Sequence, residues 1–102
     1  MKWNTSEKDR LVRAILALET RDEVRRFLRD LLTPVEIDEF TRRFQAAEML
    51  SERIPYTSIV RQTGLSSTTV ARVSKWLKGS EGGYRTAISR LHHHPIPVAR
   101  GG

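Results

Sequence analysis

The stretch that decides the fold runs from residue 55 to residue 78 and reads PYTSIVRQTGLSSTTVARVSKWLK. It predicts two short helices joined at Gly64, because glycine adopts a positive φ without steric cost. Ser66 is placed to cap the second helix, since its hydroxyl can accept from a free backbone N–H of the first turn. The apolar residues of that helix recur at the spacing of one buried stripe: Val70, Val73 and Leu77. The pattern is that of a helix-turn-helix, although an ordinary helical hairpin within a bundle would contain the same elements.

The positive charge of the chain is concentrated in the half that contains this motif. The 102 residues carry a net charge of +6. Residues 1–52 have 10 Lys and Arg against 11 Asp and Glu, whereas residues 53–102 have 8 Lys and Arg against a single acid, Glu81. A one-sided basic surface attracts phosphate and releases counterions on binding, whereas a merely solubilising surface usually mixes both signs. The distribution therefore favours double-stranded DNA as a partner.

The motif and the charge together indicate which residues contact DNA. A recognition helix brings its N-terminal residues against base edges, and short hydroxyl side chains occupy that turn here. The expected contacts are Thr57 and Arg61 from the first helix, Ser66, Ser67, Thr68, Thr69 and Ala71 near the bases, and Arg72, Lys75 and Lys78 at phosphates. Among the residues that are not expected at phosphates, only Arg61 has the planar guanidinium fork that reads guanine. We therefore expect DNA shape and bound water to carry much of the specificity.

The rest of the chain shows helical periodicity and no convincing strand pattern, so we expect an all-α fold of five to six short helices. Outside the motif, helices are expected at residues 6–19 with Ser6 as the cap, at 22–32, at 34–51 with a capping box of Thr33 and Glu36, and at 84–92. We expect one DNA-binding domain over residues 1–92, with dimerisation helices in 6–52, the helix-turn-helix in 55–78 and a flexible tail in 93–102. Arg25, Arg26 and Arg29 form either a solvated face or additional phosphate contacts.

The composition argues against several other classes of protein. The absence of cysteine excludes a disulfide framework, a thiolate metal site and a cysteine nucleophile. No apolar run approaches the roughly 20 residues that span a bilayer, and no signal-peptide pattern opens the chain, so we expect a cytoplasmic protein without a membrane partner. The three histidines lie together at 92–94 and lack the helix-spaced partners of a defined metal site. Without an acid–base pair or a nucleophile constellation, we expect no catalytic site, no metal site and no enzyme activity.

The order of these segments resembles one known family. Leu32-Thr33-Pro34 at the head of a long helix, then a helix-turn-helix with Gly64 and a Thr-Val-Ala-Arg run, is similar to the bacterial Trp repressor family over roughly residues 8–91. Gly-Gly-Tyr at 82–84 resembles its smaller members, whose ligand is not established. The resemblance implies an intertwined homodimer whose outer helices interlock into one core. Such a dimer reads two half-sites about one helical turn, roughly 34–36 Å, apart.

The resemblance also implies an effector pocket between two arginines, which are Arg43 and Arg72 in this chain. Val73 and Trp76 stand where the tryptophan-binding repressor has a glycine and a serine, and their side chains would fill the space of an indole. We therefore expect no cofactor, and no tryptophan co-ligand in particular. Two interpretations of Trp76 stay open. It either fills part of the pocket itself or packs on the last helix as a core or half-exposed aromatic.

Together these observations predict a sequence-specific DNA-binding transcriptional regulator that binds a palindromic operator as a homodimer. A DNA-binding dimer that lacks a second domain to contact polymerase is expected to act as a repressor, by occluding the DNA that it binds. Neither the operator nor a small-molecule effector can be named from these residues. Two alternatives stay open: a helical protein-interaction module, and an effector-dependent regulator without autonomous operator binding.

Overall fold

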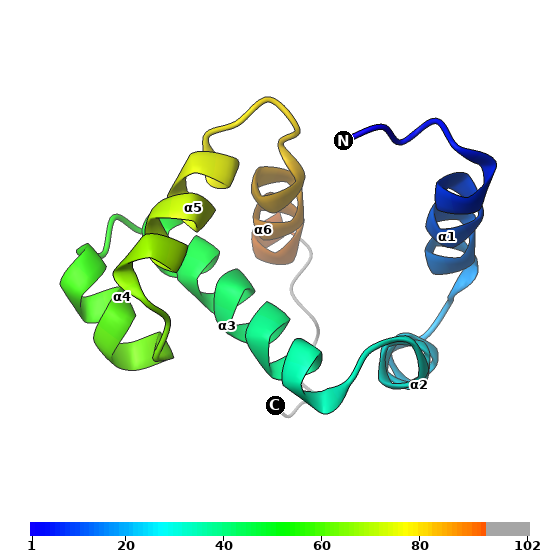
Figure 1. Ribbon diagram of the computed structural model, residues 1–102, viewed down its shortest axis with the longest axis horizontal. Helices are drawn as coiled ribbons and strands as arrows, with labels where there is room; N and C mark the ends of the chain where they lie inside the picture. The colour runs from blue at the N-terminus through cyan, green and yellow to red at the C-terminus, as the bar shows by residue number, and fades with distance from the viewer. Residues whose placement is uncertain (94–102) are drawn as a thin grey trace. The chain divides into compact units, whose positions relative to one another are not determined.

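The computed structural model describes residues 1–93, which form six α-helices and no strand (Figure 1). The helices are α1 (Ser6–Ala17), α2 (Arg21–Leu31), α3 (Pro34–Ser51), α4 (Tyr56–Thr63), α5 (Ser67–Leu77) and α6 (Gly83–His93). The expected all-α class is confirmed. None of the described helices combines the length and the apolar composition that crossing a membrane requires.

The chain folds as two compact units, one formed by residues 1–37 and the other beginning at Asp38. The first unit contains α1, α2 and the first turn of α3. Both of its complete helices start at a threonine, because the Thr5 hydroxyl accepts from the Lys8 N–H at 3.2 Å and the Thr20 hydroxyl accepts from the Glu23 N–H at 3.1 Å. Local capping of this kind fixes where a helix begins and contributes about 1 kcal/mol per cap.

The prediction of Ser6 as the first cap is wrong by one residue. Thr5 has the extended backbone of a cap, and Ser6 is already helical. The same helix ends at Ala17 and not at residue 19, because Leu18 is extended and the Glu19 N–H donates to the Glu23 carboxylate at 2.8 Å. Two adjacent hydroxyl residues can serve as a cap equally well, so sequence alone does not choose between them.

The apolar faces of α1 and α2 are not covered in this chain. Neither helix has a buried residue. Leu16 is 78% exposed, and the other uncovered large side chains of the pair are Leu11, Val12, Ile15, Val24, Leu28 and Leu31. The periodicity that predicted two amphipathic helices is therefore present, and within their own unit α1 and α2 leave these apolar faces exposed.

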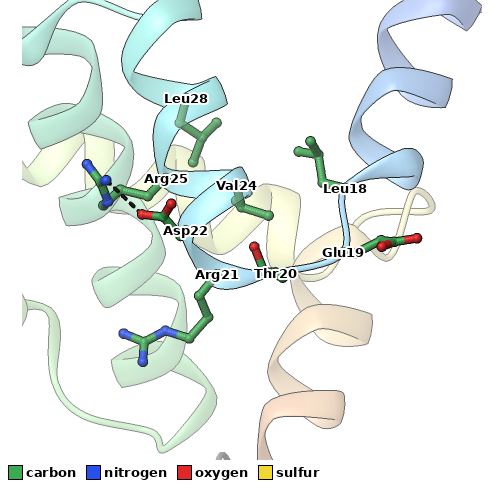
Figure 2. A pocket seen from close by; sticks show the side chains of 8 residues that line it. All are labelled: Leu18, Glu19, Thr20, Arg21, Asp22, Val24, Arg25 and Leu28. Atoms are coloured by element: carbon green, nitrogen blue, oxygen red, sulfur yellow. Dashed lines mark hydrogen bonds and ion pairs between the residues drawn. The ribbon is translucent and has the colours of Figure 1, made fainter.

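An open hollow of about 800 Å³ lies beside the connection between these two helices (Figure 2). Leu18, Val24 and Leu28 supply its apolar lining, as their side chains in Figure 2 show. At its edge the Arg25 guanidinium pairs with the Asp22 carboxylate at 2.8 Å, and the hydrogen bond from Arg25 holds the pKa of Asp22 below its ordinary value. The hollow thus has an apolar lining and a charged rim.

The second unit has a closed hydrophobic core. Its buried members come from α3, α4, the turn, α5 and α6: Ala46, Ala47, Met49, Ile59, Leu65, Val70, Val73 and Ile88. Two fully buried alanines in succession leave room for other helices to approach α3 closely. The predicted stripe of α5 is confirmed, because Val70 and Val73 are fully buried and Leu77 packs at the edge of the core. In the same unit α5 packs against both α4 and α6.

Both ends of α3 carry a recognisable capping motif. At its start the Thr33 hydroxyl accepts from the Glu36 N–H at 3.1 Å, and the Thr33 N–H donates to the Glu36 carboxylate at 2.9 Å, which confirms the predicted capping box. At its end the Ile54 N–H donates to the Met49 carbonyl at 3.1 Å, as in a Schellman motif.

Arg53 completes that motif, with its N–H donating to the Leu50 carbonyl at 2.9 Å. Its φ of +63° makes it the one residue other than glycine with positive φ in residues 1–93. A side chain in this left-handed region costs about 1–2 kcal/mol relative to glycine.

The last helix is longer than predicted. It runs from Gly83 to His93, one residue further at each end than the expected 84–92. Position 93, the first residue of the predicted tail, is thus the last residue of α6. The remainder of the predicted tail, residues 94–102, lies outside the described residues.

Candidate nucleic-acid interface

The turn between α4 and α5 is fixed by one glycine and one buried hydroxyl. Gly64 has φ +76°, and its N–H donates to the Val60 carbonyl at 2.9 Å. The Thr63 hydroxyl, which is buried, donates to the Ile59 carbonyl at 2.7 Å and accepts from the Leu65 N–H at 3.2 Å. The predicted helix–turn–helix geometry is confirmed by these bonds, which set the direction in which α5 leaves the turn.

The hydroxyl side chains at the start of α5 have two roles: two of them form the helix cap, and two others are exposed. The Ser66 hydroxyl accepts from the Thr69 N–H at 3.1 Å and donates to the Thr69 hydroxyl at 3.0 Å, so both side chains are committed to the cap. Ser67 and Thr68 are exposed, and within residues 1–93 their hydroxyls have no hydrogen-bond partner. The cap therefore holds two unengaged hydroxyls at the N-terminal end of the helix, where base edges would lie.

The remaining predicted DNA contacts lie on the surface of α4 and α5. Of the ten expected residues only Thr69 is half-buried, and the other nine are exposed. No Asp or Glu occurs between residues 55 and 78. In the described part of the chain, none of the cations on this surface forms an ion pair: Arg61, Arg72, Lys75 and Lys78. The motif thus presents unpaired positive charge, which is the condition for binding phosphate.

Arg43, one of the two residues expected at an effector pocket, is held by its own helix. Its Nε lies 3.2 Å from a Glu39 carboxylate oxygen, and its guanidinium sits 5.7 Å from the centre of the Phe40 ring. Burial raises the pKa of the Tyr84 phenol, and the positive charge of Arg43 acts in the opposite direction. The ring of Phe44, the residue after Arg43 on α3, has its centre 6.4 Å from that of Tyr84 at the start of α6.

The other expected pocket residues lie on different faces of α5. Arg72 is exposed, whereas Val73 is fully buried in the core. Trp76 is 48% exposed and lines a hollow of about 550 Å³ together with Glu81 and Tyr84 of the α5–α6 connection and α6. Neither Arg43 nor Arg72 lines this hollow, so the structure does not bring the four expected pocket residues together around it.

Arg85 is a residue that sequence reasoning does not single out. Its Nη1 donates to the Leu77 carbonyl at 2.5 Å and to the Gly79 carbonyl at 2.9 Å. These carbonyls belong to the end of α5 and the turn after it, where a helix leaves acceptors unsatisfied. A basic residue soon after a glycine-rich turn is the signal in the sequence, but many such residues are solvated.

Comparison with known proteins assigns the chain to a family. The sequence model of the Trp repressor protein family matches residues 6–92. The chain belongs to the Trp repressor protein family. The resemblance seen in the sequence is therefore confirmed, and the match covers nearly all of the described residues.

Two relatives of this family member support the same assignment. The uncharacterized protein YerC of Bacillus subtilis (strain 168) is 36% identical over 90 residues, which cover 88% of this chain and 86% of that protein. The crystal structure of a TrpR-like protein from Eubacterium eligens ATCC 27750 superposes with a TM-score of 0.82 at 36% identity, over 88% of this chain and 93% of that one. The Trp repressor family is one of DNA-binding regulators rather than enzymes. Within residues 1–93 no group of three or more His, Cys, Asp and Glu residues could hold a metal ion.

Proposed function

We propose that this member of the Trp repressor family is a sequence-specific transcriptional regulator that represses by occupying a palindromic operator as a homodimer. The observation that carries the proposal is the first turn of α5, where the Ser66 cap holds the exposed Ser67 and Thr68 hydroxyls on a surface without acidic residues. Phosphate contacts from the unpaired cations would position the helix, and the hydroxyls and Arg61 would read bases. The protein would then act in the cytoplasm, where bacterial DNA lies.

The uncovered faces of α1 and α2 support the homodimer. Moving one Leu, Val or Ile from water into a core contributes about 1.5–3 kcal/mol. A second copy of the chain offers the same apolar faces and the same hollow beside Leu18, Val24 and Leu28. In a two-fold dimer each patch would meet its counterpart, so both copies would be covered at once.

Selection from random duplex DNA tests the proposal directly. The whole protein, without added ligand, is mixed with the pool at two salt concentrations, and bound duplexes are sequenced. We expect a palindrome with half-sites roughly 34–36 Å apart. Enrichment of no sequence at either salt concentration would contradict autonomous operator binding.

An effector-dependent regulator is the second candidate, and the hollow beside Trp76, Glu81 and Tyr84 is the observation that favours it. We propose that tryptophan is not the effector, because Val73 fills the core and Trp76 already places an indole at this end of α5. Repeating the selection with and without tryptophan tests this point. A palindrome that appears only with tryptophan would overturn it.

A further inference from the structure

A small hollow of about 360 Å³ lies where the end of α3, the start of α4 and the end of α5 meet. The residues that line it include two cations, three hydroxyl side chains and an apolar floor: Arg53, Lys78, Ser51, Tyr56, Ser74, Leu50, Ile54 and Leu77. No acidic residue lines it. The hollow therefore combines positive charge with hydrogen-bond donors around a partly enclosed space.

The backbone of Arg53 shows that a side chain occupies this position at a cost. Arg53 stands at the left-handed position of the Schellman motif that ends α3, with φ +63°. Glycine is the residue that meets this conformation without strain. The side chain of Arg53 adds nothing to the motif itself, because the motif is made by backbone bonds. Strained positions of this kind cluster at functional sites, and the group that distinguishes Arg53 from glycine is its guanidinium.

Ser74 gives an independent indication of a ligand. It is 6% exposed, it lines the hollow, and within residues 1–93 its hydroxyl has no hydrogen-bond partner. A buried polar group is normally satisfied, so an unsatisfied one needs an explanation.

The helix that begins at Tyr56 has no side-chain cap, because Pro55 stands at the cap position; the Ser58 and Ile59 N–H groups donate to the Pro55 carbonyl, each at 3.1 Å. Uncapped N–H groups and the helix dipole attract an anion.

From these features we propose that the hollow binds a phosphate group. The Arg53 guanidinium would form the forked pair with two phosphate oxygens, and Lys78 would add a second positive charge. The hydroxyls of Tyr56 and Ser74 would donate to the remaining oxygens. Two sources supply this chemistry: a backbone phosphate of DNA held by the helix-turn-helix, and a phosphorylated small molecule. The first source rests on the proposed function, whereas the second does not.

Titration with inorganic phosphate at constant ionic strength, followed by NMR of the backbone amides, tests the site without DNA. We expect saturable shifts around Arg53 and Ser74, an affinity about tenfold lower in Arg53→Gly, and recovery of most of it in Arg53→Lys. Ser74→Ala should weaken binding several-fold. Arg90→Gln, which removes an exposed charge of α6 that does not line the hollow, should leave the affinity unchanged.

These variants are not expected to unfold the protein. Arg53→Gly relieves a strained φ, and Ser74→Ala removes an unsatisfied buried hydroxyl, so both should keep or raise Tm. A loss of phosphate binding in a variant of equal or higher Tm therefore reports on the hollow and not on the fold.

DNA binding by the same variants identifies the source of the phosphate. If DNA supplies it, Arg53→Gly weakens all duplexes uniformly and lowers the slope of log affinity against log salt by about one. If a small molecule supplies it, phosphate affinity falls while DNA affinity without phosphate is unchanged. Phosphate binding that falls in Arg53→Gly while the wild type binds no DNA would leave the site standing and contradict the proposed function. The site is overturned if Arg53→Gly matches Arg90→Gln in both phosphate affinity and salt slope.

Discussion

The two compact units of this chain are built from similar amphipathic helices but differ in what those helices contact. Between Asp38 and His93, α3 to α6 and the turn at Leu65 bury eight apolar side chains in a common core. In residues 1–37, α1 and α2 bury none. The interactions found in the first unit are local instead, such as the caps and the ion pairs of Asp22 with Arg25 and Arg26 at 2.8 and 2.9 Å.

Local interactions of this kind do not hold helices of this length in water. Exposed ion pairs contribute roughly 0–1 kcal/mol, and isolated helices shorter than about 12–15 residues are marginal. α1 has 12 residues and α2 has 11. The difference between the units teaches that the stability of the second follows from its own core, whereas the local interactions of the first do not account for its two helices.

The largest effect is expected from a charge on the uncovered face. Leu11→Asp should prevent dimer formation, because it places a carboxylate where the apolar face of α1 would be buried in the partner. Sedimentation equilibrium measures the loss of dimer, and circular dichroism should show loss of helix confined to the amount that α1 and α2 contribute.

Arg10→Asp is the matched control, because the neighbouring position lies on the polar side of the same helix. Equal loss of dimer in both variants would mean that the added negative charge, and not the apolar face, is responsible. A Leu11→Asp protein that stays dimeric would contradict the role given to this face.

A truncation in the core of the second unit comes next. Ile59→Ala removes a fully buried side chain of α4 and should lower the free energy of unfolding by about 2–5 kcal/mol. Val35→Ala is the comparison, because Val35 is 76% exposed and should change it by less than about 0.5 kcal/mol in the monomer. Denaturant unfolding of the Leu11→Asp background measures both without the dimer contribution. Equal losses would show that the second unit has no core of its own.

A smaller effect separates the two serines at the start of α5. Ser66→Ala removes the cap hydroxyl and should cost about 1 kcal/mol of stability. Ser67→Ala removes a hydroxyl without a partner in residues 1–93, so it should leave the free energy of unfolding nearly unchanged while weakening DNA binding. Thermal unfolding and a DNA titration of each variant check the pair. DNA binding equal to wild type in Ser67→Ala would remove this residue from the interface.

The smallest effect concerns pH. Burial raises the pKa of Tyr84 in the folded protein, so the folded state favours the neutral phenol. The associated stability is present below the unfolded pKa of about 10 and is lost as the pH rises through the raised folded value. Tyr84→Phe should therefore lose less stability in alkaline solution than the wild type. Denaturant unfolding on both sides of that range measures the difference, and parallel pH profiles would contradict it.

Sequence reasoning succeeded where a residue type has one dominant use. Gly64 and Ser66 define the turn and the cap, and Thr33 with Glu36 defines the start of α3, because each depends on neighbours within four residues. It failed at Ser6, where two adjacent hydroxyls compete for the same role. The contacts of the ten DNA residues and of the expected effector pocket stay predictions.

Other features of the candidate sites depend on residues that are distant in sequence. The contact between the Phe44 and Tyr84 rings joins α3 to α6, and the bonds of Arg85 join α6 to the end of α5. No local pattern specifies such contacts. The left-handed Arg53 is likewise hidden from sequence, because that conformation is expected of glycine or asparagine.

The helix-turn-helix has one further property that follows from its composition. Residues 55–78 contain no Asp, Glu or His, the residue types that change charge in mildly acidic or neutral solution. Acidification of the cell would therefore leave the charge of this surface constant, whereas a rise in ionic strength would screen it. If this surface binds DNA as proposed, its affinity should therefore vary little with acidity and fall as the ionic strength rises.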